Sequence, residues 1–435
     1  MKAPRIAILA MPAGKGNLGD EALLASAIEH VRRRVPDAQI LALTGNPEDT
    51  LRRHGVSAAA TGAAPPRPRE GQARRETTAP AARPVVARLK RVPGIAPAIR
   101  VVLAPLRGAR SAVREIGAAA RSLDRLRGTR LLVVPGSGVL SEHFGGPMNL
   151  PYTLCKWCAL ARLAGARIVF LSMGAGPLDS RLGRWFVKRS LNWADYHSVR
   201  DVTSKRIVDG LGVRGATPLY PDLAHSLRLP GTAPRIGTGP AREIGVNPFP
   251  QFDPRYWPER NPTSYVRYVD RLAEFCVELL RRGARLHLFP TQVRSDPLVV
   301  ADLRDAILRG MPEAADHVVV PAVETLEDLT AVLDGVDLVV ATRFHGILFA
   351  LMRTRPVLAI SNHHKMTELM IAAGQAEYVL PIDPLDPAAL LERFVALESD
   401  RVRIQADLAR RMEEFERRLA EQYDTALACL RGARA

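Results

Sequence analysis

The sequence predicts an α/β protein made of two Rossmann-like domains that face each other across a cleft. Short apolar, β-branched runs alternate with helical patterns along the chain, which is typical of a parallel sheet covered by helices on both faces. This alternation occurs twice, before and after a stretch rich in Gly, Pro and Thr at residues 228–241. With 435 residues the chain is also too long for one ordinary hydrophobic core.

The first half begins with a strand, a glycine-rich loop and a helix. An apolar run that starts at Ile6 predicts the strand, and residues 14–19 form the loop. A helix is predicted over about 21–35 with Asp20 as its N-cap, because an aspartate can accept a hydrogen bond from a free N–H group of the first turn. Further apolar runs, separated by helical patterns, predict strands at 131–134, 168–172 and 196–199.

Residues 57–128 interrupt this alternation. They are rich in Pro, Arg and Ala, and residues 61–127 contain 15 Lys and Arg against four Asp and Glu. We predict an insertion with a disordered first half and a helical second half. A solvated linker is the interpretation that we slightly favour, although the charge also suits peripheral contact with an anionic membrane. The 54 arginines against seven lysines indicate a coding bias, so no specific nucleic-acid partner is predicted.

The second half repeats the pattern. Strands are predicted at 244–247, 286–289, 318–320, 338–341 and 357–360, and a helical pattern runs from about Pro387 to Leu430. We therefore expect an N-terminal domain over 1–228, a linker over 229–241, a C-terminal domain over 242–400 and a C-terminal helix over 401–435.

Composition limits the location of the protein. No apolar run reaches the roughly 18 residues of a membrane span. The first apolar run leads into a glycine-rich loop, which is unlike a signal peptide. We therefore expect a cytoplasmic protein, with the basic segment as a candidate contact with the inner face of the membrane. The four cysteines are too few for a disulfide framework.

Charged side chains stand directly after predicted strands, namely Arg200, Arg343, His345 and Lys365. Open α/β sheets bind ligands at the carboxyl ends of their strands. The three cations therefore predict a site for a small dianion, and His345 adds a group that can move protons near neutral pH. For Arg200 taken alone, a surface salt bridge is the alternative.

Glycine-rich loops follow other strands of the first half, at 14–19, 135–138 and 173–177. Glycine lets backbone N–H groups approach an anion closely, although tight turns also use glycine for structural reasons. No loop matches a dinucleotide fingerprint or a P-loop. His363 and His364 have no carboxylate or cysteine among them, so no metal site is predicted.

Six motifs in the same order resemble the polysaccharide pyruvyl transferase family. The resemblance runs from about residue 6 to 383, outside 57–128, and is carried by Gly16-Asn17-Leu18-Gly19-Asp20-Glu21-Ala22, Pro135-Gly136-Ser137-Gly138, Met173-Gly174-Ala175-Gly176-Pro177-Leu178, Val199-Arg200-Asp201 with Ser204, Tyr220-Pro221-Asp222-Leu223-Ala224, and Thr342-Arg343-Phe344-His345-Gly346 with Lys365. It implies a glycosyltransferase-B-like fold and transfer of pyruvate from phosphoenolpyruvate to a sugar diol as a cyclic ketal.

The resemblance also implies roles for individual residues. Arg200 and Lys365 would hold the carboxylate and phosphate of the donor, and His345 would be the acid/base group. Arg343, Gly174 and Gly176 are further donor-binding candidates, and Asn17, Asp20, Ser137 and Gly138 are candidates for the acceptor side or for loops of the site. Ser137 departs from the family, which commonly has another glycine there, and so narrows its loop.

We therefore expect a ketal pyruvyl transferase that acts on a cell-surface polysaccharide or its lipid-linked precursor. A nucleotide-sugar-dependent glycosyltransferase of the same architecture is one alternative. A non-catalytic polyanion-binding protein that depends on residues 61–127 is another. The expected partners are phosphoenolpyruvate as co-substrate and a glycan or lipid-linked saccharide, without cofactor or metal, and no oligomeric state is predicted.

Overall fold

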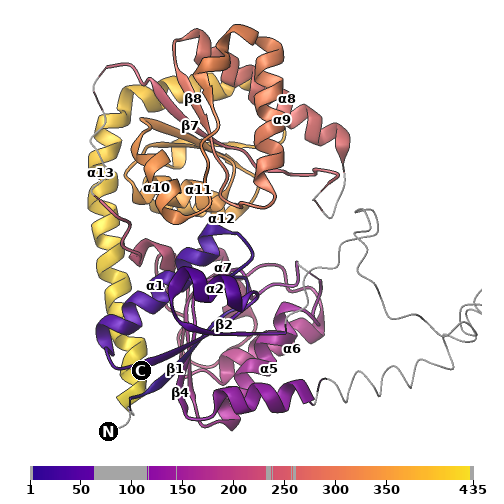
Figure 1. Cartoon of the computed structure of the whole chain (residues 1–435), viewed down its shortest axis with the longest axis vertical. Coiled ribbons are helices and arrows are strands. Elements are labelled where there is room, and N and C mark those ends of the chain that lie inside the picture. Colours follow the sequence, from indigo (N-terminus) through magenta and orange to yellow (C-terminus); the bar gives the residue numbers. More distant parts are fainter. Residues whose placement is uncertain are drawn as a thin grey trace, which may run out of the picture.

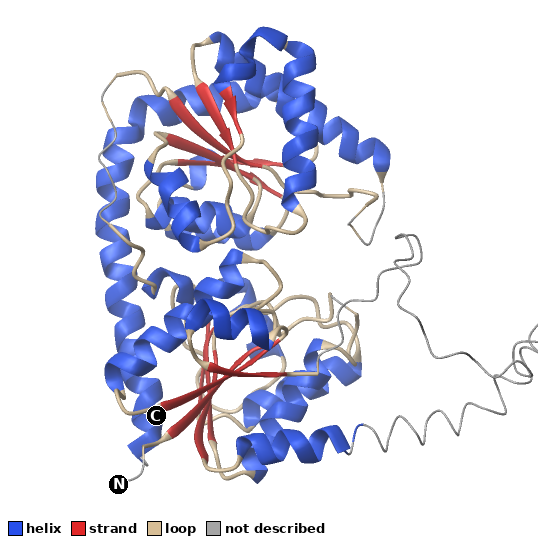
Figure 2. Cartoon of the chain, in the orientation of Figure 1, coloured by secondary structure: helices blue, strands red, loops and turns tan. Residues whose placement is uncertain are grey.

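A computed structural model describes residues 3–62, 115, 117–143, 145–231, 237, 239–255, 257 and 261–431. These residues form two α/β domains, one above the other in Figures 1 and 2, each with a parallel six-stranded sheet. The strand orders are β3-β2-β1-β4-β5-β6 and β12-β11-β10-β7-β8-β9. Both are doubly wound orders that reverse direction beside the first strand, so the predicted pair of Rossmann-like domains is confirmed.

The sheet of the N-terminal domain consists of β1 (Arg5–Ala10), β2 (Gln39–Thr44), β3 (Ser57–Ala60), β4 (Thr129–Val134), β5 (Arg167–Met173) and β6 (Tyr196–Val199). Its helices are α1 (Leu18–Arg34), α2 (Pro47–His54), α5 (Leu150–Leu163), α6 (Arg181–Asn192), α7 (Val202–Gly210) and the 3₁₀ helix η1 (Leu223–Ser226), and residues 117–126 are also helical. Alternate residues of β1 are buried in two different clusters, Ile6 and Ile8 in one and Ala7 and Leu9 in the other. The sheet is therefore covered on both faces.

The sheet of the C-terminal domain consists of β7 (Glu243–Asn247), β8 (Arg285–Leu288), β9 (Val318–Val319), β10 (Leu338–Ala341), β11 (Val357–Ser361) and β12 (Val379–Pro381). Its helices are α8 (Pro262–Arg281), α9 (Asp296–Gly310), α10 (Leu326–Asp334), α11 (Phe344–Met352) and α12 (His364–Ala372), with 3₁₀ helices η2 (Pro312–His317) and η3 (Ala376–Tyr378). β10 lies between β7 and β11 and is buried at every position, which explains its unbroken apolar sequence.

The last helix, α13 (Pro387–Ala428), joins the two domains before the chain ends in η4 (Cys429–Arg431). It is the long helix along the left of Figure 1. Near its end Tyr423 stacks on His30 of α1, with ring centroids 4.1 Å apart, and the Gln422 amide donates to the Ser198 hydroxyl over 2.7 Å. The domain boundary predicted at residue 401 is wrong, since it falls inside this continuous helix.

Two further predictions need correction. The insertion predicted to start at residue 57 starts later, because Ser57–Ala60 form the edge strand β3. Residues 63–114, with most of the basic charge predicted to contact a membrane, lie outside the described residues. The cap of α1 is Asn17 rather than Asp20, which lies in the first turn. In the part of the chain that is described, no helix combines the length and apolar composition of a membrane span.

Candidate active site between the two sheets

The candidate site lies where the two sheets present their carboxyl ends to each other. The strand order reverses between β1 and β4 in one domain and between β7 and β10 in the other, and ligands of open α/β sheets bind at such positions. Backbone hydrogen bonds join the two edges. The Leu18 N–H donates to the Thr291 carbonyl over 3.0 Å, and the Val293 N–H donates to the Gly16 carbonyl over 2.8 Å. The two reversal points therefore contribute to one site.

His345 is brought into this site by the tight turn after β10. The Thr342 N–H donates to the carbonyl of Asn247 at the end of β7, and α11 then begins at Phe344. Gly346 permits close packing of this turn, since a Cβ atom there would lie 2.0 Å from Asn247 Oδ1. His345 thus occupies the first turn of a helix that starts at the reversal point, as the sequence predicts.

The surroundings of His345 favour its neutral form. Its Nε2 atom is shielded from solvent and has no hydrogen-bond partner among the described residues. Burial lowers the pKa of His345 to about 3. Asp222 opposes this shift, and the charges of Arg200, Lys365 and Arg343 reinforce it. Burial thus moves the pKa of His345 away from the neutral range that the sequence predicts.

Arg200 is a buried residue of the site. It follows β6, its side chain is 8% exposed, and it donates to Asp222 Oδ2 over 2.7 Å. Its Nε lies 3.5 Å from Asp201 Oδ2, and its guanidinium carbon lies 4.7 Å from the Phe344 ring centroid. Burial acts to raise the pKa of Asp222, but Arg200 and then His345 outweigh it and hold that pKa below its usual range. The alternative of a surface salt bridge does not apply.

Lys365 approaches the same aromatic ring from the C-terminal domain. It lies in the first turn of α12, and its Nζ is 5.6 Å from the Phe344 centroid. Phe344 therefore contacts cations from both domains, an arrangement that the ring quadrupole favours. Burial lowers the pKa of Lys365 to about 8, and the charges of Arg200 and Arg343 add to the shift. A lysine with this pKa is charged at neutral pH.

Arg343 is paired with a buried carboxylate, as Arg200 is. It forms an ion pair with Asp296, whose side chain is completely buried at the start of α9. Its guanidinium also lies 4.6 Å from the Phe249 ring centroid. Burial raises the pKa of Asp296, while Arg343 opposes that shift. Arg343 therefore stands at the site with a carboxylate already beside it.

The loop 14–19 places backbone against His345. A Cβ atom at Gly19 would lie 2.1 Å from ring atoms of His345, so only glycine fits in this arrangement. The Asn17 side chain caps α1 by accepting from the Gly19 N–H over 3.0 Å. Glu21 fixes the other end of the loop, because it accepts from the Gly14 N–H over 2.6 Å. The loop therefore contributes by packing its backbone against His345, and the Asn17 side chain serves to cap α1.

Asp20 carries an unusual carboxyl group beside these cations. Burial is the main cause that raises its pKa to about 7, and Glu21 adds to the shift. Lys15, Arg200 and Lys365 act in the opposite direction. A carboxyl group with this pKa is protonated in part of the population at neutral pH, so Asp20 can hold a proton where His345 cannot.

Two N–H groups of the glycine-rich loop at 173–177 are used within the protein. The Gly174 N–H donates to the Ser137 carbonyl and the Gly176 N–H donates to the Leu140 carbonyl. The expectation that these two N–H groups are free for an anion is therefore not met. Gly174 instead makes room for Arg200, since a Cβ atom would lie 2.7 Å from its guanidinium. Ser137 is buried, and Gly138 has open space around its Cα atom.

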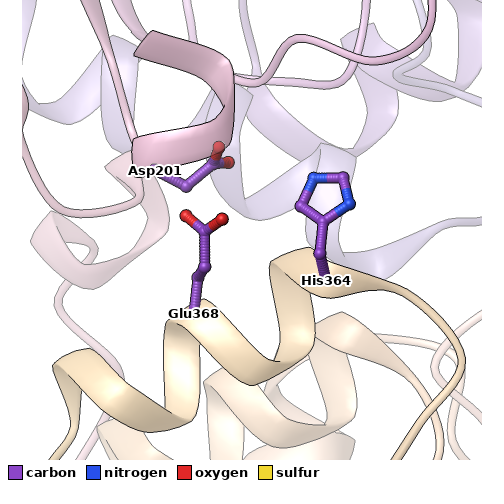
Figure 3. A group of neighbouring side chains, drawn as sticks. All are labelled: Asp201, His364 and Glu368. Atoms are coloured by element: carbon purple, nitrogen blue, oxygen red, sulfur yellow. The ribbon is translucent and has the colours of Figure 1, made fainter. Parts of the chain in front are cut away.

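A group that the sequence did not reveal lies at the edge of the site. Asp201, His364 and Glu368 each offer a possible metal-ligand atom, and these atoms lie within 4.8 Å of one another (Figure 3). Glu368 follows His364 by four residues on α12, and the contact between the two domains adds Asp201, which precedes α7. However, both carboxylates already accept hydrogen bonds from the first turn of α7. Their geometry is thus explained by helix capping.

Partner carboxylates are the residues that sequence reasoning missed. Asp222 and Asp296 pair with Arg200 and Arg343, and neither is adjacent in sequence to its partner. Asp222 belongs to one of the family-like motifs, but the sequence assigned it no role, and nothing in the local pattern distinguished Asp296 or Glu368.

A cavity of about 310 Å³ lies elsewhere, between α8 and residues 382–387, and none of the four predicted charged residues lines it.

The two domains together have a fold of the glycosyltransferase-B type. The chain is similar in fold to a UDP-GlcNAc 2-epimerase from Neisseria meningitidis, with 8% identity, coverage of 98% of this chain and 99% of that one, and a TM-score of 0.54. It is equally similar to a glycosyltransferase from Rickettsia africae, with 8% identity, full coverage of both chains and a TM-score of 0.54. No curated protein matches the sequence.

The family follows from the sequence itself. The family model for polysaccharide pyruvyl transferase matches residues 17–364, a range that contains Arg200, His345 and the loop from Asn17 onward. The chain belongs to the polysaccharide pyruvyl transferase family, and the resemblance seen in its motifs is confirmed.

Proposed function

We propose that the protein transfers pyruvate from phosphoenolpyruvate to two hydroxyl groups of a saccharide, forming a cyclic ketal and releasing phosphate. The observation that carries this proposal is the convergence of Arg200 and Lys365, from different domains, on the Phe344 ring beside His345. A donor with a carboxylate and a phosphate needs two separated cations. Family membership supports the transfer of a pyruvyl group.

The site has the electrostatic character that this donor requires. After burial, which is the main cause, Arg200, Lys365 and Arg343 all act to lower the pKa of His345, while Asp222 opposes them, so three cations act together on this position. Charge-assisted hydrogen bonds from such cations bind carboxylate and phosphate strongly. The same cations stabilise the charge that develops on the leaving phosphate.

The reaction requires a defined movement of protons. Addition of a proton to C3 of the donor converts its CH₂ group into CH₃ and leaves C2 electron-poor. One saccharide hydroxyl adds to C2, phosphate leaves, and the second hydroxyl closes the ring. Two hydroxyl protons are lost, one of which balances the proton on C3 and the other the proton on the released phosphate. The enzyme therefore needs both a proton donor and a proton acceptor.

His345 and Asp20 suit these two roles. His345 is neutral, because its pKa is about 3, and it can accept a proton from a hydroxyl group. The anionic donor neutralises the cations that depress this pKa, and the imidazolium form becomes more favourable as catalysis proceeds. Asp20, with a pKa of about 7, is the group that holds a proton for C3 at the start of the reaction.

The acceptor is proposed from the family alone as a cell-surface polysaccharide or its lipid-linked precursor. The basic segment 61–127, as a contact with an anionic membrane that carries lipid-linked saccharides, is part of the same proposal.

Phosphorus NMR of the purified protein with phosphoenolpyruvate tests the donor. When extracts of candidate glycan precursors are added, the signal of inorganic phosphate should appear. Mass spectrometry of the same mixture should then show a saccharide whose mass is increased by one pyruvyl ketal. A nucleotide sugar that is consumed while phosphoenolpyruvate is untouched would instead support a glycosyltransferase and would reject the donor assignment.

A further inference from the structure

A carboxylate of the C-terminal domain caps a helix of the N-terminal domain. Glu368, on α12, accepts hydrogen bonds from the backbone N–H groups of Val202 over 2.7 Å and Thr203 over 3.2 Å, and from the Thr203 hydroxyl. The first N–H groups of a helix have no acceptor within it, and negative charge is favourable at that end. Glu368, from the other domain, thus accepts hydrogen bonds from the free N–H groups at the start of α7.

The two segments that this contact joins lie next to the two donor-binding cations. Arg200 lies two residues before Val202, and Lys365 lies three residues before Glu368, on the same side of α12. Asp201 caps α7 from within the N-terminal domain by accepting from the Ser204 N–H over 2.6 Å. Figure 3 shows Glu368 reaching toward Asp201 at this boundary. The contact therefore links the backbone segments that position Arg200 and Lys365.

We propose that Glu368 is a positioning residue that holds the two domains closed, so that Arg200 and Lys365 reach the same donor molecule. This inference rests on the proposed function for its kinetic part. The shielded Nε2 atom of His345 indicates that the structure is closed, and ligands enter when the domains separate. The Glu368 contact breaks on opening and forms again on closure.

The kinetic consequence follows from the population of the closed form. If the donor is bound productively only by the closed form, its apparent affinity falls in proportion to the closed fraction. Glu368→Ala should therefore raise the KM for phosphoenolpyruvate about tenfold or more, while kcat at saturating donor stays within about twofold of wild type, because the donor itself restores closure. Glu368→Gln keeps one acceptor oxygen and should lie between the two.

Hydrogen exchange measures the contact without any substrate. Electron-transfer fragmentation mass spectrometry resolves the amides of Val202, Thr203 and Ser204. In Glu368→Ala the first two should exchange about tenfold or more faster, whereas the Ser204 amide, which donates to Asp201, should change little. Glu377→Gln, which removes an exposed carboxylate of the same domain, should match wild type in exchange and in KM.

The outcomes separate the possible failures. Unchanged exchange at Val202 and Thr203 in Glu368→Ala, or a lower kcat with an unchanged KM, overturns the proposal. If wild type neither binds nor uses phosphoenolpyruvate, the donor assignment fails, and exchange alone decides whether Glu368 links the domains. Zinc or manganese ions that slow exchange in wild type but not in His364→Ala would overturn the proposal in favour of a metal site at the same three side chains.

Discussion

The two domains have the same strand order but contribute to the site in different ways. The C-terminal domain supplies charged or proton-moving side chains on consecutive strand ends, Arg343 and His345 after β10 and Lys365 after β11. The N-terminal domain supplies Arg200 and Asp20, and otherwise backbone, because Gly19 lies against His345 and Gly174 lies against Arg200. The C-terminal domain provides most of the reactive side chains, while the N-terminal domain mainly provides backbone that packs closely against them.

This difference explains why a glycine-rich strand end can be misinterpreted. A glycine-rich strand end is compatible with an anion-binding loop, but in this chain the N–H groups of Gly174 and Gly176 are used within the protein. The absent side chain is what matters, since it lets a charged group from elsewhere come close. The following predictions test whether the C-terminal domain supplies most of the reactive side chains and the N-terminal domain the close packing around them.

The largest effect is expected at the chemical centre of the C-terminal domain. His345→Asn should lower kcat by about 10² to 10⁴ with a smaller change in donor affinity, because the proton acceptor is lost while the cations remain. Steady-state kinetics and calorimetry with phosphoenolpyruvate measure the two effects. His317→Gln, an exposed histidine of the same domain, serves as control. Retention of more than about a tenth of wild-type kcat would remove His345 from its role.

The shape supplied by the N-terminal domain is tested by Gly19→Ala. The added methyl group would overlap the imidazole of His345, so the ring or the loop must move, and a displacement of about 1 Å can cost up to about 10² in rate. Gly210→Ala is the matched control, since nothing lies within 4 Å of a Cβ atom there. Equal activity in the two variants would show that the close packing on His345 is irrelevant to catalysis.

Neutralising one cation from each domain compares their contributions to donor binding. Arg200→Gln and Lys365→Met should each weaken phosphoenolpyruvate binding by about 1.5–3 kcal/mol, because a charge-assisted contact is lost from a partly buried site. Calorimetry in the presence of a chelator measures both and tests metal independence at once. Identical affinity in wild type and both variants, or no binding without added divalent ions, would contradict the donor site.

The smallest effect is the pH dependence that Asp20 confers. Its protonated form is the active one, and it exists below a pKa of about 7, so kcat/KM should fall as pH rises through that value. Lys365 loses its charge near 8 and adds a second fall, whereas His345, with a pKa of about 3, does not titrate in this range. Glu21, Lys15, Arg200 and Lys365 all influence Asp20.

Asp20→Asn separates the two ionisations. It should lower the rate and leave only the fall near pH 8. The donor phosphate, whose second pKa is about 6 for a phosphate ester, contributes equally to both profiles. A profile in Asp20→Asn that keeps the fall near pH 7 would assign this ionisation to another group.

The sequence predicts the local parts of this molecule well and the contacts between distant parts poorly. β10 and the Arg343–His345 turn could be located because a buried parallel strand needs a continuous apolar run that ends abruptly. Asp222 and Glu368 could not be assigned roles, because a carboxylate that pairs across 22 residues or caps a helix of another domain leaves no periodic signal. The pKa of His345 depends on burial between two domains, and it likewise has no local signature.

Some local predictions were also wrong, for identifiable reasons. Asp20 and Asn17 are both good N-cap residues, and only the backbone of the loop decides that Asn17 caps α1. β3 consists of Ser57 and three alanines, residues with little preference for strands, and therefore looked like the start of the insertion. The break predicted at residue 401 has no physical counterpart, since the helical pattern continues through it.

The path of α13 determines from which side the enzyme can open. The helix starts in the C-terminal domain and ends against α1 and β6 of the N-terminal domain, along one side of the molecule (Figure 1). It therefore connects the two domains along that side. If the domains separate as proposed for the Glu368 contact, we expect the separation to be smallest along α13 and ligands to enter from the face turned away from it.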